Sequence, residues 1–192
     1  MKKVCNTIKQ THLTRGDKSK AFGLLFVALL LLVSCKSSHS VQKAYMTQLA
    51  KASITLGIDI DKHDDHALFL ESAHWIGVPY RYGGNNEAGI DCSGLSSVIY
   101  NKVYHTPIPR TSSKQYTQSH HKSKKHKKLK QGSLLFFTSP KANSNTCSHV
   151  GIFLKDDKFI HASSSRGVMI SRLSETYWQQ NWLGSGYFGT SF

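Results

Sequence analysis

The chain has 192 residues, four of them cysteine, and a formal net charge of +14. Its length suits one domain with a hydrophobic core. Cys5 and Cys35 belong to the N-terminal segment, so only Cys92 and Cys147 remain, and a lone pair does not make a disulfide framework. The charge is uneven, because residues 1–34 hold six basic side chains and one acidic one, and six more lysines lie between Lys122 and Lys130. The basicity is therefore local and does not describe the whole surface.

Residues 1–34 have the pattern of a signal peptide. A basic start precedes the apolar run 21–33, which is shorter than the roughly 20 residues of a bilayer-spanning helix. The run ends in Val33-Ser34-Cys35, which matches a bacterial lipobox. We therefore expect Cys35 to be lipidated and to become the mature N-terminus. The alternative is an ordinary signal or a short anchor with a chance cysteine.

A lipidated Cys35 predicts a protein anchored in the cell envelope. Lys36 stands where many enterobacterial lipoproteins of the inner membrane have an aspartate, so we expect the outer membrane, facing the periplasm. Residues 35–40 would be the lipidated polar tether. Export also argues against nucleic acid as a partner.

Helices are expected in the first half of the mature chain. Apolar residues recur at helical spacing over 41–56, and Gly57 is a stop signal. A second helix should begin at Asp64 or Asp65, with Asp64 as a plausible cap, and end at Trp75. A charged helix start explains His63-Asp64-Asp65-His66 better than a metal site does. The remaining expected segments are a turn-rich loop over 77–84, a helix over 92–104 and a helix over 111–116.

Strands are expected in the second half. The expected elements are strands over 134–138, 149–155, 158–161 and 168–171, a short helix over 175–182 and a last strand over 185–190. Helices followed by strands predict an α+β fold with an antiparallel sheet. We expect a helical extension over 41–66 and a catalytic domain over 67–192. The run 120–130 is interpreted as a solvated loop, with attraction of Lys122–Lys130 to anionic polymers as the alternative.

Cys92 is the candidate nucleophile. It stands at the predicted start of a helix, where the helix dipole favours thiolate. His149 opens one predicted strand and His161 closes another, so His149 can accept the thiol proton and His161 can orient it. Cys147, two residues before His149, is interpreted as a loop or half-buried thiol, and a redox partner for Cys92 is the alternative.

Five motifs in order resemble the NlpC/P60 family of cell-wall cysteine peptidases. They span roughly residues 68–190. They are Pro79-Tyr80-Arg81-Tyr82-Gly83-Gly84, Asp91-Cys92-Ser93-Gly94-Leu95, Pro109-Arg110-Thr111-Ser112 with Gln115, Ser148-His149-Val150-Gly151-Ile152, and Phe159-Ile160-His161-Ala162-Ser163. One departure is Gln131-Gly132-Ser133-Leu134, where the family usually has Pro-Gly-Asp-Leu.

The resemblance implies a papain-like α+β domain whose nucleophile helix packs on an antiparallel sheet. It implies cleavage of peptidoglycan peptide stems, typically between the γ-carboxyl of D-glutamate and a diamino acid, with no metal or organic cofactor. By position, Cys92 would be the nucleophile, His149 the base and His161 the third polar residue. Tyr80 would help line the oxyanion site.

Asp91 and Ser93 match family positions that contact the substrate upstream of the cut. Two other functions stay open on the same fold. One is a thiol amidase or acyltransferase, which the same residues would serve. The other is a non-catalytic cell-wall binding lipoprotein, against which the intact Cys92, His149 and His161 argue.

Overall fold

The computed structural model describes residues 39–125, 129–140 and 146–189. The chain divides into two compact units, 1–46 and 47–192. In the first unit, residues 39–46 are helical, which includes the last two residues of the expected tether. The predicted signal peptide and Cys35 lie outside the described residues. Within the described ranges, no helix is both long enough and apolar enough to cross a membrane.

The second unit begins with helical residues 47–56, in which Leu49, Ala52 and Leu56 are buried as their helical spacing predicts. Four further helices follow. They are α2 (His66–Trp75), α3 (Cys92–Tyr104), α4 (Ser112–Gln118) and α5 (Thr176–Asn181). Thr111 caps α4, as its position before the helix predicts, by accepting a hydrogen bond from Lys114 N–H.

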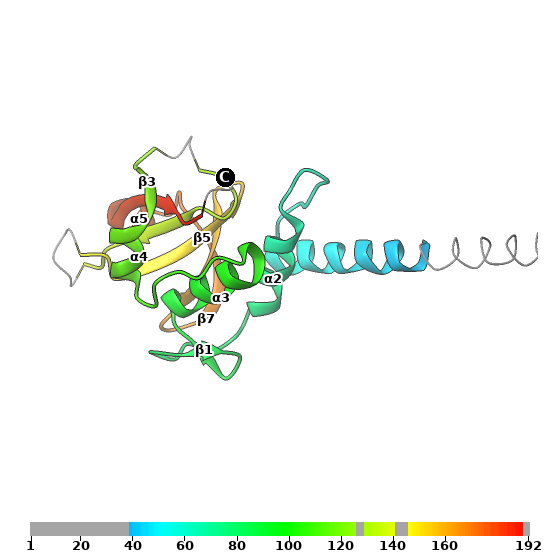
Figure 1. Cartoon of the computed structure of the whole chain (residues 1–192), viewed down its shortest axis with the longest axis horizontal. Helices are drawn as coiled ribbons and strands as arrows, with labels where there is room; N and C mark the ends of the chain where they lie inside the picture. The colour runs from blue at the N-terminus through cyan, green and yellow to red at the C-terminus, as the bar shows by residue number, and fades with distance from the viewer. Residues whose placement is uncertain (1–38, 126–128, 141–145, 190–192) are drawn as a thin grey trace, which may run out of the picture. The chain divides into compact units, whose positions relative to one another are not determined.

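Six antiparallel strands form the sheet, in the order β3-β8-β4-β5-β6-β7. A separate two-stranded hairpin follows the loop after α2 (Figure 1). The strands of the sheet are β3 (His120–Ser123), β4 (Leu134–Phe137), β5 (His149–Lys155), β6 (Lys158–Ser163), β7 (Gly167–Arg172) and β8 (Trp182–Tyr187), and the hairpin pairs β1 (Asn85–Asn86) with β2 (Gly89–Ile90). Most helices precede the strands of the sheet, and every described pair of neighbouring strands in it is antiparallel. These two features confirm the α+β prediction.

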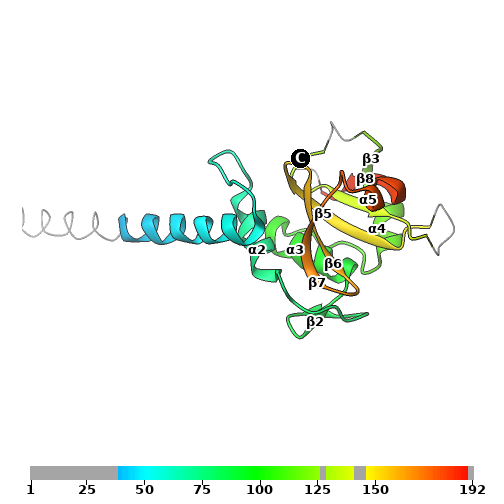
Figure 2. The same ribbon diagram turned by 180° about the vertical axis from the view of Figure 1, so that it is seen from behind.

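Each face of the sheet has its own apolar core. Leu134 and Phe136 of β4 belong to the core shared with α3, and Leu135 and Phe137 belong to the core shared with Trp178 of α5. This alternation follows from the two-residue period of a strand. Helix α3 packs against β5 and β6, as two opposite views of the ribbon illustrate (Figures 1 and 2). The nucleophile helix is therefore held against the central strands.

Three local predictions need correction. Asp65 caps α2 in place of Asp64, because the Asp64 carboxylate accepts hydrogen bonds from Lys155, at 2.8 Å, and from Gln131. Residues 120–123, expected in a solvated loop, form the edge strand β3, because they pair with β8. Strand β8 begins three residues earlier than expected, because Trp182 already pairs with Phe137 of β4.

Candidate active site

Cys92 is the first residue of α3, and Asp91 caps this helix. The Oδ1 atom of Asp91 accepts a hydrogen bond from Gly94 N–H at 2.7 Å, which satisfies one of the N–H groups that have no partner inside the helix. Gly94 lets the preceding loop come close, because a Cβ atom there would lie 2.3 Å from the carbonyl oxygen of Gly84. The cap and this glycine together fix the position of the cysteine.

Arg110 ties Asp91 to the loop before the helix. Its Nη1 and Nη2 atoms each donate to one carboxylate oxygen of Asp91 at 2.9 Å, and Nη2 also donates to the Gly84 carbonyl. Asp91 accepts a further hydrogen bond from Gly83 N–H at 2.8 Å. Burial acts to raise the pKa of Asp91, but the hydrogen bonds from Arg110, Gly94 and Gly83 outweigh it and hold that pKa below its ordinary value.

Ser93 belongs to the same network. Its hydroxyl donates to Asp91 Oδ1 at 3.0 Å and accepts from Arg110 Nη1 at 3.0 Å. Asp91 and Ser93 are both buried, and both line a cavity of about 360 Å³ beside Cys92. Protein groups already engage their polar atoms, so the pair forms a rigid wall of this cavity. Their contact with substrate stays a prediction.

Strands β5 and β6 bring the two predicted histidines together. His149 is the first residue of β5, and His161 is the fourth residue of β6. The Nε2 atom of His149 lies 3.1 Å from Nδ1 of His161. The Nε2 atom of His161 lies 3.0 Å from Oγ of Ser171 on β7. Side chains from three neighbouring strands therefore form one hydrogen-bonded chain.

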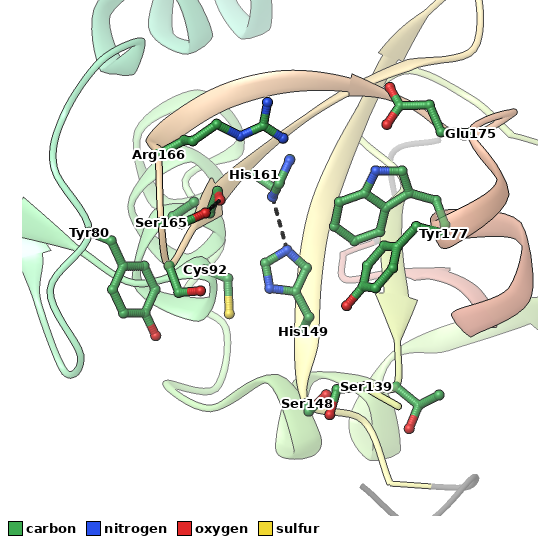
Figure 3. A pocket seen from close by; sticks show the side chains of 15 residues that line it. Tyr80, Cys92, Ser139, Ser148, His149, His161, Ser165, Arg166, Glu175 and Tyr177 are labelled. Atoms are coloured by element: carbon green, nitrogen blue, oxygen red, sulfur yellow. Dashed lines mark hydrogen bonds between the residues drawn. The ribbon is translucent and has the colours of Figure 1, made fainter. Parts of the chain in front are cut away.

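This chain leaves one ring nitrogen of His149 for chemistry. Because Nε2 is engaged by His161, Nδ1 is the remaining nitrogen, and Figure 3 shows the Cys92 sulfur on that side of the ring. If Nε2 of His149 donates, Nδ1 of His161 accepts, and Nε2 of His161 then donates to Ser171. These tautomers leave Nδ1 of His149 free to accept a proton.

Trp178 of α5 covers both histidines. Its ring stacks on His149 with 5.5 Å between ring centroids and meets His161 edge-on at 4.8 Å. Burial lowers the pKa of His149 to about 4. Burial also lowers the pKa of His161 far below its ordinary value, and the nearby His149 and Arg166 lower it further. Both rings are therefore neutral at pH 7.

Burial opposes the thiolate that the helix start favours at Cys92. Burial raises the pKa of the Cys92 thiol to about 11 and outweighs the hydrogen bond that Val150 N–H gives to the sulfur. The charge of Asp91 raises this pKa further. The resting pair is thus a neutral thiol beside a neutral imidazole.

Tyr80 lines two cavities that meet at Cys92. One is the 360 Å³ cavity, and the other, of about 540 Å³, also has His149 and His161 in its wall (Figure 3). Tyr80 pairs with Ile90 of β2 in an isolated bridge, which anchors its backbone. Burial raises the pKa of Tyr80, so its hydroxyl keeps its proton and can donate a hydrogen bond into the site.

The comparisons with known proteins place this site in a family. The model of the NlpC/P60 family matches residues 77–186, a segment that includes Tyr80, Cys92, His149 and His161. The chain belongs to the NlpC/P60 family.

Relatives of this NlpC/P60 chain include two from Escherichia coli K12. The "Murein DD-endopeptidase MepS/Murein LD-carboxypeptidase" is 29% identical over 171 residues, which cover 83% of this chain and 88% of that protein. The "Probable endopeptidase NlpC" is 34% identical over 160 residues, which cover 83% of this chain and 94% of that protein. A solved structure from Staphylococcus aureus, described as similar to a lipoprotein of the NLP/P60 family, matches with a TM-score of 0.58 at 28% identity. The match covers 69% of this chain and 44% of that larger one.

Three residues of the NlpC/P60 site were not predicted as site residues. Arg110 lies in a motif shared with the family, and that motif is the signal that could have found it. Ser171 reaches His161 only through the pairing of β6 with β7, in which His161 lies opposite Met169. Trp178 reaches the histidines through the packing of α5. Sequence periodicity predicts these elements and does not predict their contacts.

Cys147 is not among the residues that line the two cavities. It is buried, and its Sγ donates to the carbonyl oxygen of His149 at 3.4 Å. Burial raises the pKa of this thiol to about 12. Cys92 and Cys147 are both free thiols. Cys147 is more deeply buried than the loop or half-buried thiol that we expected, and a redox partnership with Cys92 stays a prediction.

Residues 63–66 were the segment for which a metal site was the alternative interpretation. In the structure, polar side chains of this segment contact other protein groups. The carboxylates of Asp61 and Asp64 both accept hydrogen bonds from Lys155 at 2.8 Å, and His66 Nε2 lies 2.7 Å from the Asp61 carbonyl oxygen. Across the described ranges, no group of three or more His, Cys, Asp or Glu side chains is placed to hold a metal ion.

Proposed function

We propose that the protein is a cysteine endopeptidase that cuts the peptide stems of peptidoglycan by acyl transfer. Its membership of the NlpC/P60 family supports the class of enzyme, and the MepS relative, named as a murein endopeptidase, supports the substrate. The observation that carries the proposal is the hydrogen-bonded chain from Ser171 through His161 to His149. His149 lines the same cavity as Cys92, and Figure 3 shows the sulfur on the Nδ1 side of its ring.

The first half of the reaction forms an acyl-enzyme. Because Cys92 and His149 are neutral at rest, Nδ1 of His149 takes the thiol proton as Sγ attacks the amide carbonyl carbon. The carbonyl oxygen becomes negative, and the Tyr80 hydroxyl and the backbone N–H groups of Cys92 and Ser93 at the start of α3 stabilise it. The C–N bond then breaks as the imidazolium gives its proton to the leaving amine.

The second half releases the acyl group. Neutral His149 takes a proton from water, whose oxygen attacks the thioester carbonyl carbon. The C–S bond breaks, and the proton returns from His149 to the Cys92 sulfur, so the enzyme recovers its resting state. His161 acts through His149, because its hydrogen bond holds Nε2 and keeps Nδ1 turned toward Cys92.

The bond between the γ-carboxyl of D-glutamate and a diamino acid is the first candidate for cleavage, as the family resemblance implies. The name of the MepS relative favours a second candidate, a bond between two residues of D configuration. Purified peptidoglycan should be digested with the protein and the products identified by mass. Cleavage at glutamate yields stems that end in D-glutamate, whereas cleavage between D residues separates cross-linked stems without shortening them.

The same digestion separates the other functions on this fold. A thiol acyltransferase would attach an added amine to the acyl fragment, and the product mass would include that amine. A binding lipoprotein would retain peptidoglycan in a pull-down and release no fragment. Our proposal expects free carboxylic acid products, and it fails if the protein binds peptidoglycan and cuts no bond.

The cell-wall substrate places the protein in the cell envelope. We propose that a lipid on Cys35 anchors it there, in the outer membrane facing the periplasm, on the basis of the sequence 21–36. Cys35→Ser should leave unprocessed precursor that takes up no fatty-acid probe, while the wild-type protein is labelled and fractionates with the outer membrane. Trimming and membrane attachment of Cys35→Ser without label would contradict this proposal.

We also propose that the lysines of Lys122–Lys130 attract the protein to anionic polymers of the wall. Lys124 and Lys125, just after the edge strand β3, are exposed and outside both cavities. Exposed charges act over about 8 Å at physiological salt, so Lys124→Gln with Lys125→Gln should weaken binding to intact wall. Turnover of a short soluble stem should stay unchanged. An equal loss of both would place this segment in the substrate cleft.

A further inference from the structure

Cys147 contacts the backbone of the base, although it lines neither cavity. Its Sγ donates to the carbonyl oxygen of His149 at 3.4 Å, and the residue is only 4% exposed. Burial raises the pKa of this thiol, so the sulfur keeps the hydrogen that it donates. The backbone N–H groups of Phe137, on β4, and of His149 itself donate to the Cys147 sulfur. The thiol therefore both accepts and donates hydrogen bonds beside the base.

The nucleophile contacts the other end of the same peptide unit. The carbonyl group of His149 and the N–H group of Val150 belong to one peptide, and Val150 N–H donates to the Cys92 sulfur. The pairs of β5 with β6 begin at Ile152, so Val150 lies beyond the part of β5 that pairs with β6. The peptide is trans, so its C=O and N–H groups point in opposite directions. Cys147 and Cys92 thus contact opposite ends of one peptide unit.

Hydrogen bonds at the two ends of a peptide strengthen one another. A donor at the carbonyl oxygen polarises the amide, and the N–H group becomes a better donor. The Cys92 sulfur gains negative charge when His149 takes its proton, so the hydrogen bond from Val150 then becomes charge-assisted. The hydrogen bond from Cys147 also holds the backbone of His149, whose ring must reach the same sulfur. Both effects favour proton transfer from Cys92.

We propose that Cys147 is a positioning residue for the reaction and acts on the Cys92 sulfur through the peptide unit between His149 and Val150. The inference rests on the proposed function, because it assigns a role in the cysteine mechanism to a thiol outside the cavities. The role needs no covalent bond to the Cys147 sulfur and no change in its oxidation state. A side chain that donates to the His149 carbonyl oxygen should support turnover, and one without a donor should impair it.

Two pairs of substitutions separate the hydrogen bond from the packing. Cys147→Ser and Cys147→Thr keep a donor, whereas Cys147→Ala and Cys147→Val remove it. Threonine and valine have nearly the same shape, so the second pair differs in the donor and hardly in volume. With a soluble stem and the mature protein, kcat should be roughly two- to fivefold lower without the donor than in the matched partner. KM should stay unchanged, because Cys147 lines neither cavity.

Ser72→Ala is the control at another buried position. The Ser72 hydroxyl lies on α2, and within the described ranges it is buried without a hydrogen-bond partner. Its removal should therefore leave kcat unchanged. A loss in Ser72→Ala as large as that in Cys147→Ala would mean that kcat responds to any change in the core, and this result would contradict the inference.

A second readout does not need peptidase activity. Alkylation of Cys92 by iodoacetamide, followed across pH, reports the thiolate. Within each pair, the rate should rise at a higher pH in the variant without the donor, because the Val150 hydrogen bond to the thiolate is weaker. The comparison is made within pairs because Cys147 is itself titratable and is absent from both members. The other titratable groups around the sulfur stay the same in every variant. They are Tyr80, Asp91, Arg110 and His149.

Two results would overturn the inference and leave the endopeptidase function standing. One is equal kcat and equal alkylation curves within both pairs. The other is a loss of kcat without a shift of the alkylation curve, which is the result of a merely structural role. If the curves shift as expected but no form of the protein, including wild type, cuts a stem, the proposed function fails and the effect of Cys147 on Cys92 stands.

Discussion

The Oγ atom of Ser171 lies 3.0 Å from Nε2 of His161, while the other ring nitrogen of His161 faces His149 at 3.1 Å. The Ser171 hydroxyl can accept the hydrogen of Nε2 of neutral His161, and this arrangement goes with the tautomer in which Nδ1 of His161 is an acceptor. That tautomer is the one that orients His149 for proton transfer from Cys92. Ser171 is therefore a positioning residue at the end of the chain.

Ser171→Ala should lower kcat by roughly fivefold, because one lost hydrogen bond is worth about 1 kcal/mol. KM should change little, since Ser171 is not among the residues lining the cavities. Ser171→Thr keeps the hydroxyl and should restore most of kcat. If Ser171→Thr and Ser171→Ala lower kcat equally, the packing at this buried position matters and the hydroxyl group does not.

The two histidines should differ in their effect on turnover. His149→Ala removes the base, a contribution of about 10²–10⁴-fold in kcat. His161→Ala should cost less, because water can take over part of the hydrogen bonding to His149. Single-turnover rates on a soluble stem would measure both. A larger loss for His161→Ala than for His149→Ala would exchange the roles that we assign.

The neutral resting pair predicts how the reactivity of Cys92 depends on pH. Burial raises the pKa of this thiol to about 11, so its alkylation by iodoacetamide should be slow at pH 7 and should rise up to about that value. The labelled peptide, identified by mass, distinguishes Cys92 from Cys147. Fast labelling of Cys92 at pH 5 to 7 would mean that the resting site holds a thiolate and an imidazolium.

The Asp91–Arg110 ion pair should contribute stability that depends on pH. Asp91→Asn should lower the free energy of unfolding at pH 7 by about 1–2 kcal/mol, a modest value because the Arg110 side chain is 41% exposed. The folded-state pKa of Asp91 is below its ordinary value. Its contribution is therefore present above the ordinary pKa and is lost as pH falls through the folded-state pKa.

Denaturant unfolding at pH 7 and pH 3 would measure this difference. The exposed Asp59→Asn is the matched control, and it should leave stability nearly unchanged at both values. A deficit of Asp91→Asn that grows on acidification would show that the carboxylate is not stabilised in the folded protein.

Local sequence signals predict the elements that carry the site. Helix α3 and strand β5 have the expected bounds, because a glycine-rich turn and an apolar period are local features. The shift of β8 and the edge strand β3 could not be predicted in this way, because both depend on pairing between distant strands. The hairpin β1–β2 was not predicted either, since each of its strands has only two residues.

The chemistry of the site could likewise be predicted only in part from the sequence. Family motifs point to Cys92, His149 and His161, and the structure brings the histidines within hydrogen-bonding distance. The raised pKa of Cys92 could not be predicted, because it depends on burial in the folded protein. The shielding of the histidines by Trp178 likewise depends on how α5 packs on the sheet.

The most direct test of the account is digestion of purified peptidoglycan by Cys92→Ser and by Cys147→Ser, with the products identified by mass. The two variants make the same change at two buried thiols, and Cys92 alone of the two lines the cavities. We predict that Cys147→Ser releases the same stem fragments as the wild-type protein and that Cys92→Ser releases none. Fragments released by folded Cys92→Ser at the wild-type rate would contradict the mechanism.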